Sequence, residues 1–413
     1  MNHNTAMPPS ENQATSPFIG LAPLMRQAFS GVDLKPLGTS LIEQSTRRPD
    51  DAHAMMDLAT VLQLTGNRDI AMAMQAQALQ LQQVYRIPAS TPIPAIRLLA
   101  LMAPGDLMAN TPLEFLIEQS DIQLDMLYLT PGMEGLSELP DHDVMFVAIG
   151  ESDENRPLLE QLASVASTWP RPVLNRPERI ANLSRDRACA LLKDAAGVAM
   201  PQSLRVSRDK LEAIAEAKMP LQQLLEDAQF PIIVRPVGSH AGHGLDKIES
   251  VEQAARYLEA HQNAEFYIAR FVDYRSADGQ FRKYRIILID GKPYVSHMAI
   301  SSHWMIHYLN AGMTDSQEKR NEEERFMAGF DDGFAVRHAQ AFQSISENLG
   351  LDYVGLDCGE AVDGRLLIFE ADSDMIVHAM DPVDMFPYKQ PQMHKLFAAF
   401  RRMLVDAAAG GAA

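Results

Sequence analysis

Apolar residues follow two different spacings along this 413-residue chain. Between residues 48 and 86 they recur every three or four positions on both sides of Gly66, which predicts two helices joined by a short turn. From residue 96 to 180, short apolar runs alternate with amphipathic stretches, as they do in parallel α/β units. Residues 87–95 carry three prolines, which predicts a stiff linker and a domain boundary between the two patterns.

The helical pair in residues 48–86 is similar to one tetratricopeptide (TPR) repeat in its length, its central Gly66, its Ala71 and its late Tyr85. A single repeat of this kind cannot bury its own apolar face, so it must pack on the rest of the chain or on another subunit. Two interpretations stay open. The pair is either an ordinary packing element or a repeat that binds a protein partner.

Composition narrows the class of protein. The formal net charge is −18, which argues against nucleic acid and against anionic membrane surfaces as partners, because both are polyanions. The N-terminal residues show no secretory signal pattern, and no apolar run reaches membrane-spanning length. Only Cys189 and Cys358 are available, so no disulfide framework is expected. These features predict a cytoplasmic protein.

A glycine-rich segment, PIIVRPVGSHAGHGLDKIES (231–250), carries the first sign of chemistry. A β-branched run ends in Arg235, and the loop after it contains Gly238, Ser239, Gly242 and Gly244. Such a loop can point backbone N–H groups at phosphate while the arginine neutralises charge at its edge. A glycine-rich hairpin with a surface arginine is the alternative.

Three acids near the end of a strand carry the second sign. The sequence DYVGLDCGEAV, then Asp363-Gly364, then RLLIFEADSD predicts a β-hairpin with a two-residue turn. This register places Asp357 opposite Glu370, and the two-residue period places Asp372 on the face of Glu370. Clustered carboxylates need a cation or raised pKa values, and an all-oxygen set suits Mg²⁺ or Mn²⁺ bridging nucleotide phosphates. Three solvated acids at a strand end are the alternative.

Together these segments resemble the ATP-grasp superfamily, and its RimK-type and glutathione-synthetase-like ligases in particular, over roughly residues 96–405. The stretch NRPERIANLSRDRACALLKDAAGVAMPQS resembles the segment that carries a phosphate-binding lysine, with Arg187 in its place. Arg235 stands in the place of a second such lysine. EFYIARFV resembles the hinge that holds adenine, which implies adenine contacts at Arg270, Phe271 and Val272.

The segment FRKYRIILIDGKPY resembles the paired strands that present an Asp-x-Arg motif. Arg285 falls on the arginine, which implies contact with the transferred phosphate and a catalytic role. Lys283 replaces the acid of the motif, and Asp273 is the candidate to replace its sugar contact. By the same resemblance, Asp357, Glu370 and Asp372 fall on the metal ligands.

Residues 303–312, HWMIHYLNAG, fall where relatives carry residues near the γ-phosphate. His303, Trp304 and His307 are therefore candidates for the substrate site. Simple packing of these side chains is the alternative.

The expected fold is α/β (α+β): an ATP-grasp fold preceded by a small open α/β domain and an N-terminal helical hairpin. The expected order is a disordered leader (1–17), a helical TPR-like region (18–90), the open α/β domain (95–180), a two-lobed ATP-grasp domain with nucleotide between its lobes (181–405) and a flexible tail (406–413).

The resemblance implies an ATP-dependent ligase that uses ATP with Mg²⁺ or Mn²⁺. A carboxylate would be activated as an acyl phosphate and attacked by an amine or a thiol, with release of ADP and phosphate. The expected substrates are small molecules or peptides whose identity the sequence does not disclose, and family habit implies a homodimer.

Two other functions stay open. One is a nucleotide-binding scaffold that recruits a partner through the helical region, which the lysine-to-arginine changes and Lys283 favour. The other is phosphoryl transfer to an acceptor that is not a carboxylate, because a fold does not fix its chemistry.

Overall fold

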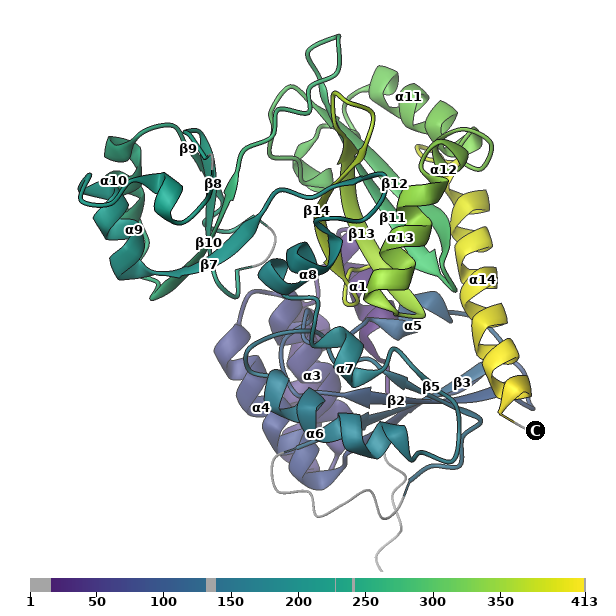
Figure 1. The fold of residues 1–413 in the computed structure, drawn as a ribbon. Coiled ribbons are helices and arrows are strands. Elements are labelled where there is room, and N and C mark those ends of the chain that lie inside the picture. The colour runs from purple at the N-terminus through teal and green to yellow at the C-terminus, as the bar shows by residue number, and fades with distance from the viewer. Residues whose placement is uncertain (1–15, 131–138, 227, 240–241, 412–413) are drawn as a thin grey trace, which may run out of the picture.

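The computed structural model describes residues 16–130, 139–226, 228–239 and 242–411. Within these ranges the chain folds into three β-sheets with helices packed on them (Figure 1). This is the mixed α/β class that the sequence predicts. Most of the expected leader, residues 1–15, lies outside the described ranges, whereas Ser16 is held by a hydrogen bond of 2.7 Å from its hydroxyl to Asp51.

The N-terminal region is helical up to residue 81. Its helices are α1 (Leu21–Phe29), α2 (Lys35–Arg47), α3 (Ala52–Leu64) and α4 (Arg68–Leu81). The hairpin expected around Gly66 is formed by α3 and α4, and Gly66 turns the chain with φ 82°. Met55 of α3 and Ala78 of α4 are buried in the same core as the first sheet. The hairpin therefore packs on its own chain, while its kinship with TPR repeats stays a prediction.

The first sheet has the strand order β1-β3-β2-β4-β5. Its strands are β1 (Val84–Ile87), β2 (Ile96–Met102), β3 (Ile122–Tyr128), β4 (Val144–Val147) and β5 (Val173–Leu174). The last four are parallel, as the alternating pattern predicts. Helices α5 (Leu113–Leu116), α6 (Arg156–Ser167) and α7 (Pro177–Ile180) lie between or after these strands.

The expected domain boundary at residues 87–95 is wrong. Residues 84–87 are not the end of a helix but strand β1, which pairs antiparallel with β3. Tyr85 is fully buried there, and its aromatic side chain suits a strand between packed neighbours. The proline-rich segment therefore connects two strands of one sheet, and α3 and α4 share the core of that sheet.

The second sheet is antiparallel, with the order β7-β10-β8-β9, and forms the lobe set to the left in Figure 1. Its strands are β7 (Ser203–Ser207), β8 (Ile232–Pro236), β9 (Asp246–Ile248) and β10 (Glu265–Arg270). Helices α9 (Arg208–Ala215) and α10 (Val251–Ala260) belong to this lobe and share its core. The β-branched run before the glycine-rich loop is β8, as predicted.

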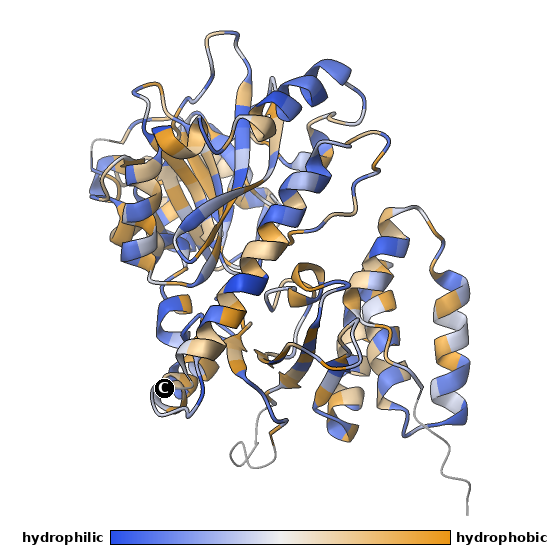
Figure 2. Cartoon of the chain, turned by 90° about the vertical axis from the view of Figure 1, so that its right-hand side faces the viewer, coloured by the Kyte–Doolittle hydropathy of each residue, from blue (hydrophilic) through white to orange (hydrophobic). Residues whose placement is uncertain are grey.

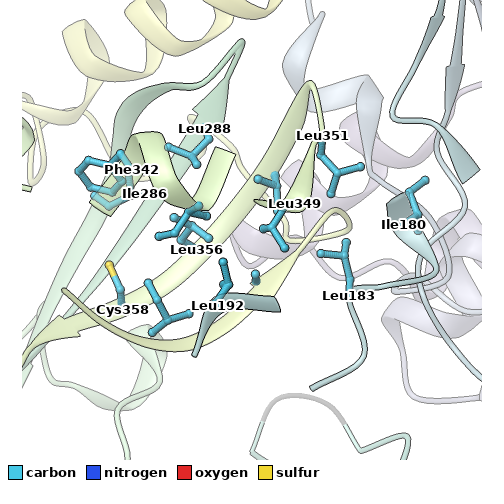
Figure 3. Packing of buried hydrophobic residues seen from close by; sticks show 14 of the residues in the cluster. Ile180, Leu183, Leu192, Ile286, Leu288, Phe342, Leu349, Leu351, Leu356 and Cys358 are labelled. Carbon is cyan, nitrogen blue, oxygen red and sulfur yellow. The ribbon is translucent and has the colours of Figure 1, made fainter. Parts of the chain in front are cut away.

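The third sheet has the order β12-β11-β13-β14-β6. Its strands are β6 (Val198–Ala199), β11 (Phe281–Ile289), β12 (Lys292–Ser301), β13 (Tyr353–Glu360) and β14 (Leu366–Asp372). One face packs against α8 (Arg185–Leu192) and α13 (Ala339–Leu349), and Figure 3 shows Leu192, Leu349 and Leu356 in that core. The other face packs partly on α14, at Ile287 and Tyr353, and its remaining part carries polar side chains that line a cavity.

The β13–β14 hairpin departs from the expected two-residue turn. Glu360 pairs with Leu366, so the connection is longer than Asp363-Gly364 alone. The register then shifts between Asp357 and Cys358, which restores the predicted pairing of Asp357 with Glu370. The longer connection and the shift of register therefore compensate for each other, and Asp357 still lies opposite Glu370.

The chain ends in α14 (Lys389–Gly410), a helix that packs against the first sheet. Residues 406–410 are therefore helical and not the expected flexible tail, because a run of alanines continues a helix readily. Residues 412–413 lie outside the described ranges. Figure 2 shows α14 with alternating hydrophilic and hydrophobic stretches, as expected of a helix packed on one side.

The remaining helices, α11 (Gln317–Ala328) and α12 (Phe334–Arg337), follow β12 in the chain. Throughout the described ranges, every helix is too short or too polar to span a bilayer.

Candidate active site

A cavity of about 590 Å³ is lined by residues of the second and third sheets and of α1. Twelve of the residues discussed from the sequence line it: Arg235, Gly242, Arg270, Phe271, Val272, Lys283, Arg285, Trp304, His307, Asp357, Glu370 and Asp372. They come from segments up to 137 positions apart, and the pairing of strands brings them to one place. The cavity is therefore the candidate active site.

A row of charged side chains crosses three neighbouring strands on the cavity side. Arg285 on β11 pairs with Asp357 on β13, and Asp357 pairs with Glu370 on β14. The guanidinium of Arg285 donates from Nε and Nη2 to the two oxygens of Asp357, at 2.8 and 3.0 Å. Lys283 lies 2.6 Å from Asp357 Oδ2. Antiparallel pairing thus fixes this row, of which the predicted hairpin register gave the Asp357–Glu370 pair.

Both cations change the electrostatics of Asp357. Burial alone would raise its pKa, but Arg285 and Lys283 hold the pKa well below its usual range. Arg285 is itself kept charged by Asp357, whose charge and hydrogen bonds outweigh the desolvation that burial imposes. Asp357 is therefore an ionised carboxylate whose oxygens are already occupied.

Glu370 is paired with a different cation. Burial opposes its ionisation, yet its pKa is lowered by Arg185, with which it forms an ion pair, and by Arg235. Next to it, burial raises the pKa of Asp372, and the charge of Glu370 adds to that effect. Burial also raises the pKa of Asp374, which Asp372 raises further. At the end of β14, the protonated forms of Asp372 and Asp374 are thus favoured relative to those of isolated acids.

The three predicted metal ligands do not form a ready-made ligand group. In the ranges that the structure covers, no three His, Cys, Asp or Glu side chains are grouped to hold a metal ion. The reason is that Asp357 faces Arg285 and Lys283, while Glu370 faces Arg185. The predicted register is confirmed, whereas the metal site itself stays a prediction.

The phosphate-binding arginine expected on α8 is displaced by two positions. Arg187 does not line the cavity, and its Nη1 donates to the backbone oxygen of Ala181 at 2.9 Å. Arg185, at the start of the same helix, lines the cavity and pairs with Glu370. Residues two apart on a helix point in different directions, so Arg185 and not Arg187 lines the cavity, and phosphate binding by Arg187 stays a prediction.

Arg235 lies where the sequence places it, at the cavity end of β8. Its side chain is buried, and burial together with the nearby charge of Arg185 lowers its pKa to about 10. Its Nε donates to Ser239 Oγ at 3.3 Å, which holds the start of the glycine-rich loop. Arg235 and Arg185 therefore bring two positive charges to one side of Glu370.

The glycine-rich loop divides between two hollows. Gly242 lines the main cavity, whereas Gly238, Ser239 and Gly244 line a second hollow of about 350 Å³. Gly238 and Gly244 have φ 72° and 66°, conformations that favour glycine. Residues 240–241 between them lie outside the described ranges. Part of the predicted phosphate loop is thus turned away from the cavity.

The predicted hinge lines the cavity as Arg270, Phe271 and Val272. The ring of Phe271 meets the ring of Trp304 edge to face, with centroids 5.8 Å apart. Asp273, the expected sugar contact, does not line the cavity and forms an ion pair with Arg275 instead. Its position after the strand turns its carboxylate outward, so this assignment is not supported.

Of the three residues predicted for the substrate site, two line the cavity and one does not. Trp304 and His307 line the cavity, but His303 does not and is exposed. Burial lowers the pKa of His307, and the charges of Lys283 and Arg285 lower it further, so its imidazole is neutral at pH 7. A neutral imidazole can accept a proton.

Sequence reasoning missed the far end of the cavity, which α1 and the segment after β14 supply. Met25 and Phe29 of α1 line it together with Ile376, His378 and Lys389. A helix more than 300 residues before His378 carries no local sign of such a contact. The sequence of α1 shows apolar residues at helical spacing, and packing in an ordinary hydrophobic core would account for them equally well.

No protein-family model matches the sequence, and no curated protein matches it either. Among solved structures, the chain is similar to a RimK domain ATP-grasp protein from Sphaerobacter thermophilus (TM-score 0.42, 15% identity, 76% of this chain and 99% of that one). It is similar to the ATP-grasp ligase PsnB complexed with a precursor peptide and AMPPNP (0.39, 16%, 75% and 98%). It is also similar to D-alanyl-alanine synthetase A from Vibrio cholerae (0.46, 14%, 78% and 100%).

Proposed function

We propose that this protein is an ATP-dependent ligase of the ATP-grasp type, which activates a carboxylate as an acyl phosphate for attack by an amine. One observation carries the proposal. Within one cavity, the charged row Arg285, Asp357 and Glu370 on the third sheet faces Arg235 and the hinge residues of the second sheet. This arrangement supports a polyphosphate held between two lobes, with its base at the hinge and its terminal phosphate near the row.

Positively charged side chains of the protein would stabilise the transition state of this reaction. Arg185, Arg235 and Arg285 would neutralise the phosphates, and Lys283 would add a fourth positive charge. A carboxylate oxygen of the substrate attacks the γ-phosphorus and ADP leaves. The amine then attacks the acyl carbon, phosphate leaves, and the amine loses a proton, which the neutral His307 can accept. Positioning and charge neutralisation account for such a reaction without a nucleophile from the protein.

The donors at the end of β14 fit Mg²⁺ in part. Asp374 Oδ1 is buried without a hydrogen-bond partner, as judged from the described atoms, and Asp372 beside it has a raised pKa. Such oxygens suit a hard divalent cation, which would shield the phosphate oxygens. Glu370 and Asp372 would hold the ion. Asp357 does not fit in this state, because Arg285 occupies both of its oxygens.

The test is Mg²⁺-dependent release of ADP with a mixture of carboxylates, with hydroxylamine added to trap an acyl phosphate as a hydroxamate. Glu370→Gln should lower turnover by about 100-fold, since losing one charge contact typically costs about 2–4 kcal/mol in the transition state. Asp363→Asn is the matched control, because this acid lies in the exposed connection of the same hairpin and pairs with Arg365 of that connection. Equal turnover of wild type and Glu370→Gln would refute the proposal.

A nucleotide-binding scaffold is the second candidate, and the pairing of Asp357 with Lys283 favours it. This pairing removes one of the three expected metal ligands. Tight binding of ATP without hydroxamate or ADP under any substrate mixture would support the scaffold and exclude the ligase. Hydroxamate would also exclude phosphoryl transfer to a hydroxyl group.

A further inference from the structure

The far end of the cavity has an apolar wall that begins in α1. Met25 and Phe29 lie in the last two turns of this helix and line the cavity. Met108, Ile376 and Met380 line the same cavity. We call these five residues the α1 wall. Methionine and aromatic side chains adapt to apolar groups of varied shape, so the wall has the composition of a binding surface.

The α1 wall adjoins the charged row directly. Arg285 Nη1 donates to the backbone oxygen of Ile376 at 3.4 Å. Ile376 and Met25 pack on the cluster formed by Ala22, Phe115 and Met380. A substrate whose carboxylate meets Arg285 would therefore extend its other end along the α1 wall.

The polar groups at this end are neutral or already paired. Burial lowers the pKa of His378 to about 4, so its imidazole is uncharged, and its ring meets that of Phe29 at 5.3 Å between centroids. Lys389 lies 3.1 Å from Asp381 Oδ2 and above the ring of Tyr308. Among the described lining residues of this end, neither cation nor acid is left over for a charged substrate side chain.

The wall continues to the mouth of the cavity. Phe29 is 39% exposed and Leu309 is 77% exposed, although both line the cavity. Exposed large apolar side chains beside a cavity are typical of a surface that a ligand covers. Phe29 of the α1 wall is thus both part of the cavity lining and reachable from solvent.

We infer that α1 forms the substrate-selecting wall of the site, and that the carboxylic acid accepted there carries an apolar or aromatic group lying against Met25 and Phe29. This inference rests on the proposed function, because Arg285 is taken as the group that meets the carboxylate. It assigns α1, a helix of the N-terminal region, a role in specificity.

Calorimetry with the full chain tests the inference, in the presence of AMPPNP and Mg²⁺. Two probes of similar length are compared: 3-phenylpropionate, which is apolar at one end, and glutarate, which is charged at both. We expect 3-phenylpropionate to bind at least 10-fold more tightly. Phe29→Ala and Met25→Ala should each weaken its binding about 5-fold or more and leave the affinity for AMPPNP unchanged.

Two further variants make the result decisive. Ile42→Ala on α2 is the control, because Ile42 is exposed and does not line the cavity; it should change neither affinity. Met25→Lys adds a cation to the wall and should shift the preference toward glutarate, which a loss of folding would not produce. Thermal melting of each variant confirms that it is folded.

The inference is overturned if glutarate binds as well as 3-phenylpropionate, if neither probe binds, or if Phe29→Ala and Met25→Ala leave binding unchanged. Failure of the proposed function looks different, because either AMPPNP itself would not bind, or ATP would bind without release of ADP or formation of hydroxamate. In that case binding of 3-phenylpropionate without nucleotide, and its loss in Phe29→Ala, would still support the apolar wall.

Discussion

Asp357 and Glu370 face each other across the β13–β14 hairpin, although the connection between the strands is longer than two residues. A shift of register after Asp357 compensates for the longer connection. The pair is held in place by cations on both sides, Arg285 on one and Arg185 on the other. The buried carboxylate of Asp357 and the partly exposed one of Glu370 can be neighbours here because each has its own positive partner.

Asp357→Asn should destabilise the fold. The change leaves the partly buried cations Arg285 and Lys283 close together without their buried anion, and breaking a buried pair typically costs about 3–5 kcal/mol. Denaturant unfolding measures the free energy directly. Asp363→Asn, in the exposed part of the same hairpin, should change it by less than about 1 kcal/mol. Equal stability of both variants would show that the row is not a stabilising element.

The two arginines of α8 should differ in their effect on nucleotide. Arg185→Ala should weaken binding of AMPPNP and lower turnover by about 100-fold, because Arg185 lines the cavity beside Glu370. Arg187→Ala should leave both nearly unchanged, because Arg187 is bonded to Ala181 outside the cavity. If Arg187→Ala weakens nucleotide binding and Arg185→Ala does not, Arg187 binds phosphate, as the family resemblance implies.

Nucleotide binding should change the fluorescence of Trp304. The chain has two tryptophans, and Trp169 lies away from the cavity, where its Nε1 donates to His142 at 3.1 Å. In a Trp169→Phe background the signal comes from Trp304 alone, which meets the hinge residue Phe271. We expect ATP to quench this signal, and a Trp304→Phe, Trp169→Phe chain serves as the blank. ATP binding without any change at Trp304 would place adenine elsewhere.

The anchoring of α1 should depend on pH. Ala22 N–H donates to Glu114 at 3.0 Å, and burial raises the pKa of this carboxyl from 4.5 to about 7. A raised folded pKa means that stability is fully present below about pH 4.5 and is lost as the pH rises through 7. The loss attributable to Glu114 is roughly 3 kcal/mol, at about 1.4 kcal/mol per pKa unit.

Glu114→Gln keeps an acceptor oxygen but cannot ionise, so its melting temperature should fall less than that of the wild type between pH 5 and pH 8. Part of the pH dependence should remain in this variant because of Asp57. Burial raises the pKa of Asp57 to about 6, and its carboxylate accepts hydrogen bonds from the N–H groups of Ile19 and Gly20. Glu43→Gln is the control, because Glu43 is an exposed acid on α2 that pairs with Arg47 of the same helix. A wild type and Glu114→Gln with parallel pH profiles would contradict the assignment.

The sequence by itself determined the class of fold and the pairing at the centre of the candidate site. Periodicity identified the α3–α4 hairpin, the parallel strands of the first sheet and the β13–β14 hairpin, because spacing of apolar residues reports directly which face is buried. It also predicted Asp357 opposite Glu370, and this pairing is found because the longer connection and the shift of register compensate for each other.

Tertiary structure alone decided which charged side chains form ion pairs in the candidate site. Arg185 and Glu370 are 185 residues apart, and the choice of Arg185 over Arg187 depends on the orientation of α8 against β14. The packing of distant segments also decides two other contacts. Lys283 forms an ion pair with Asp357, and residues of α1 line the cavity. Local spacing carries no information about such contacts, because they are fixed by the summed packing of the whole core and not by the residues that make them.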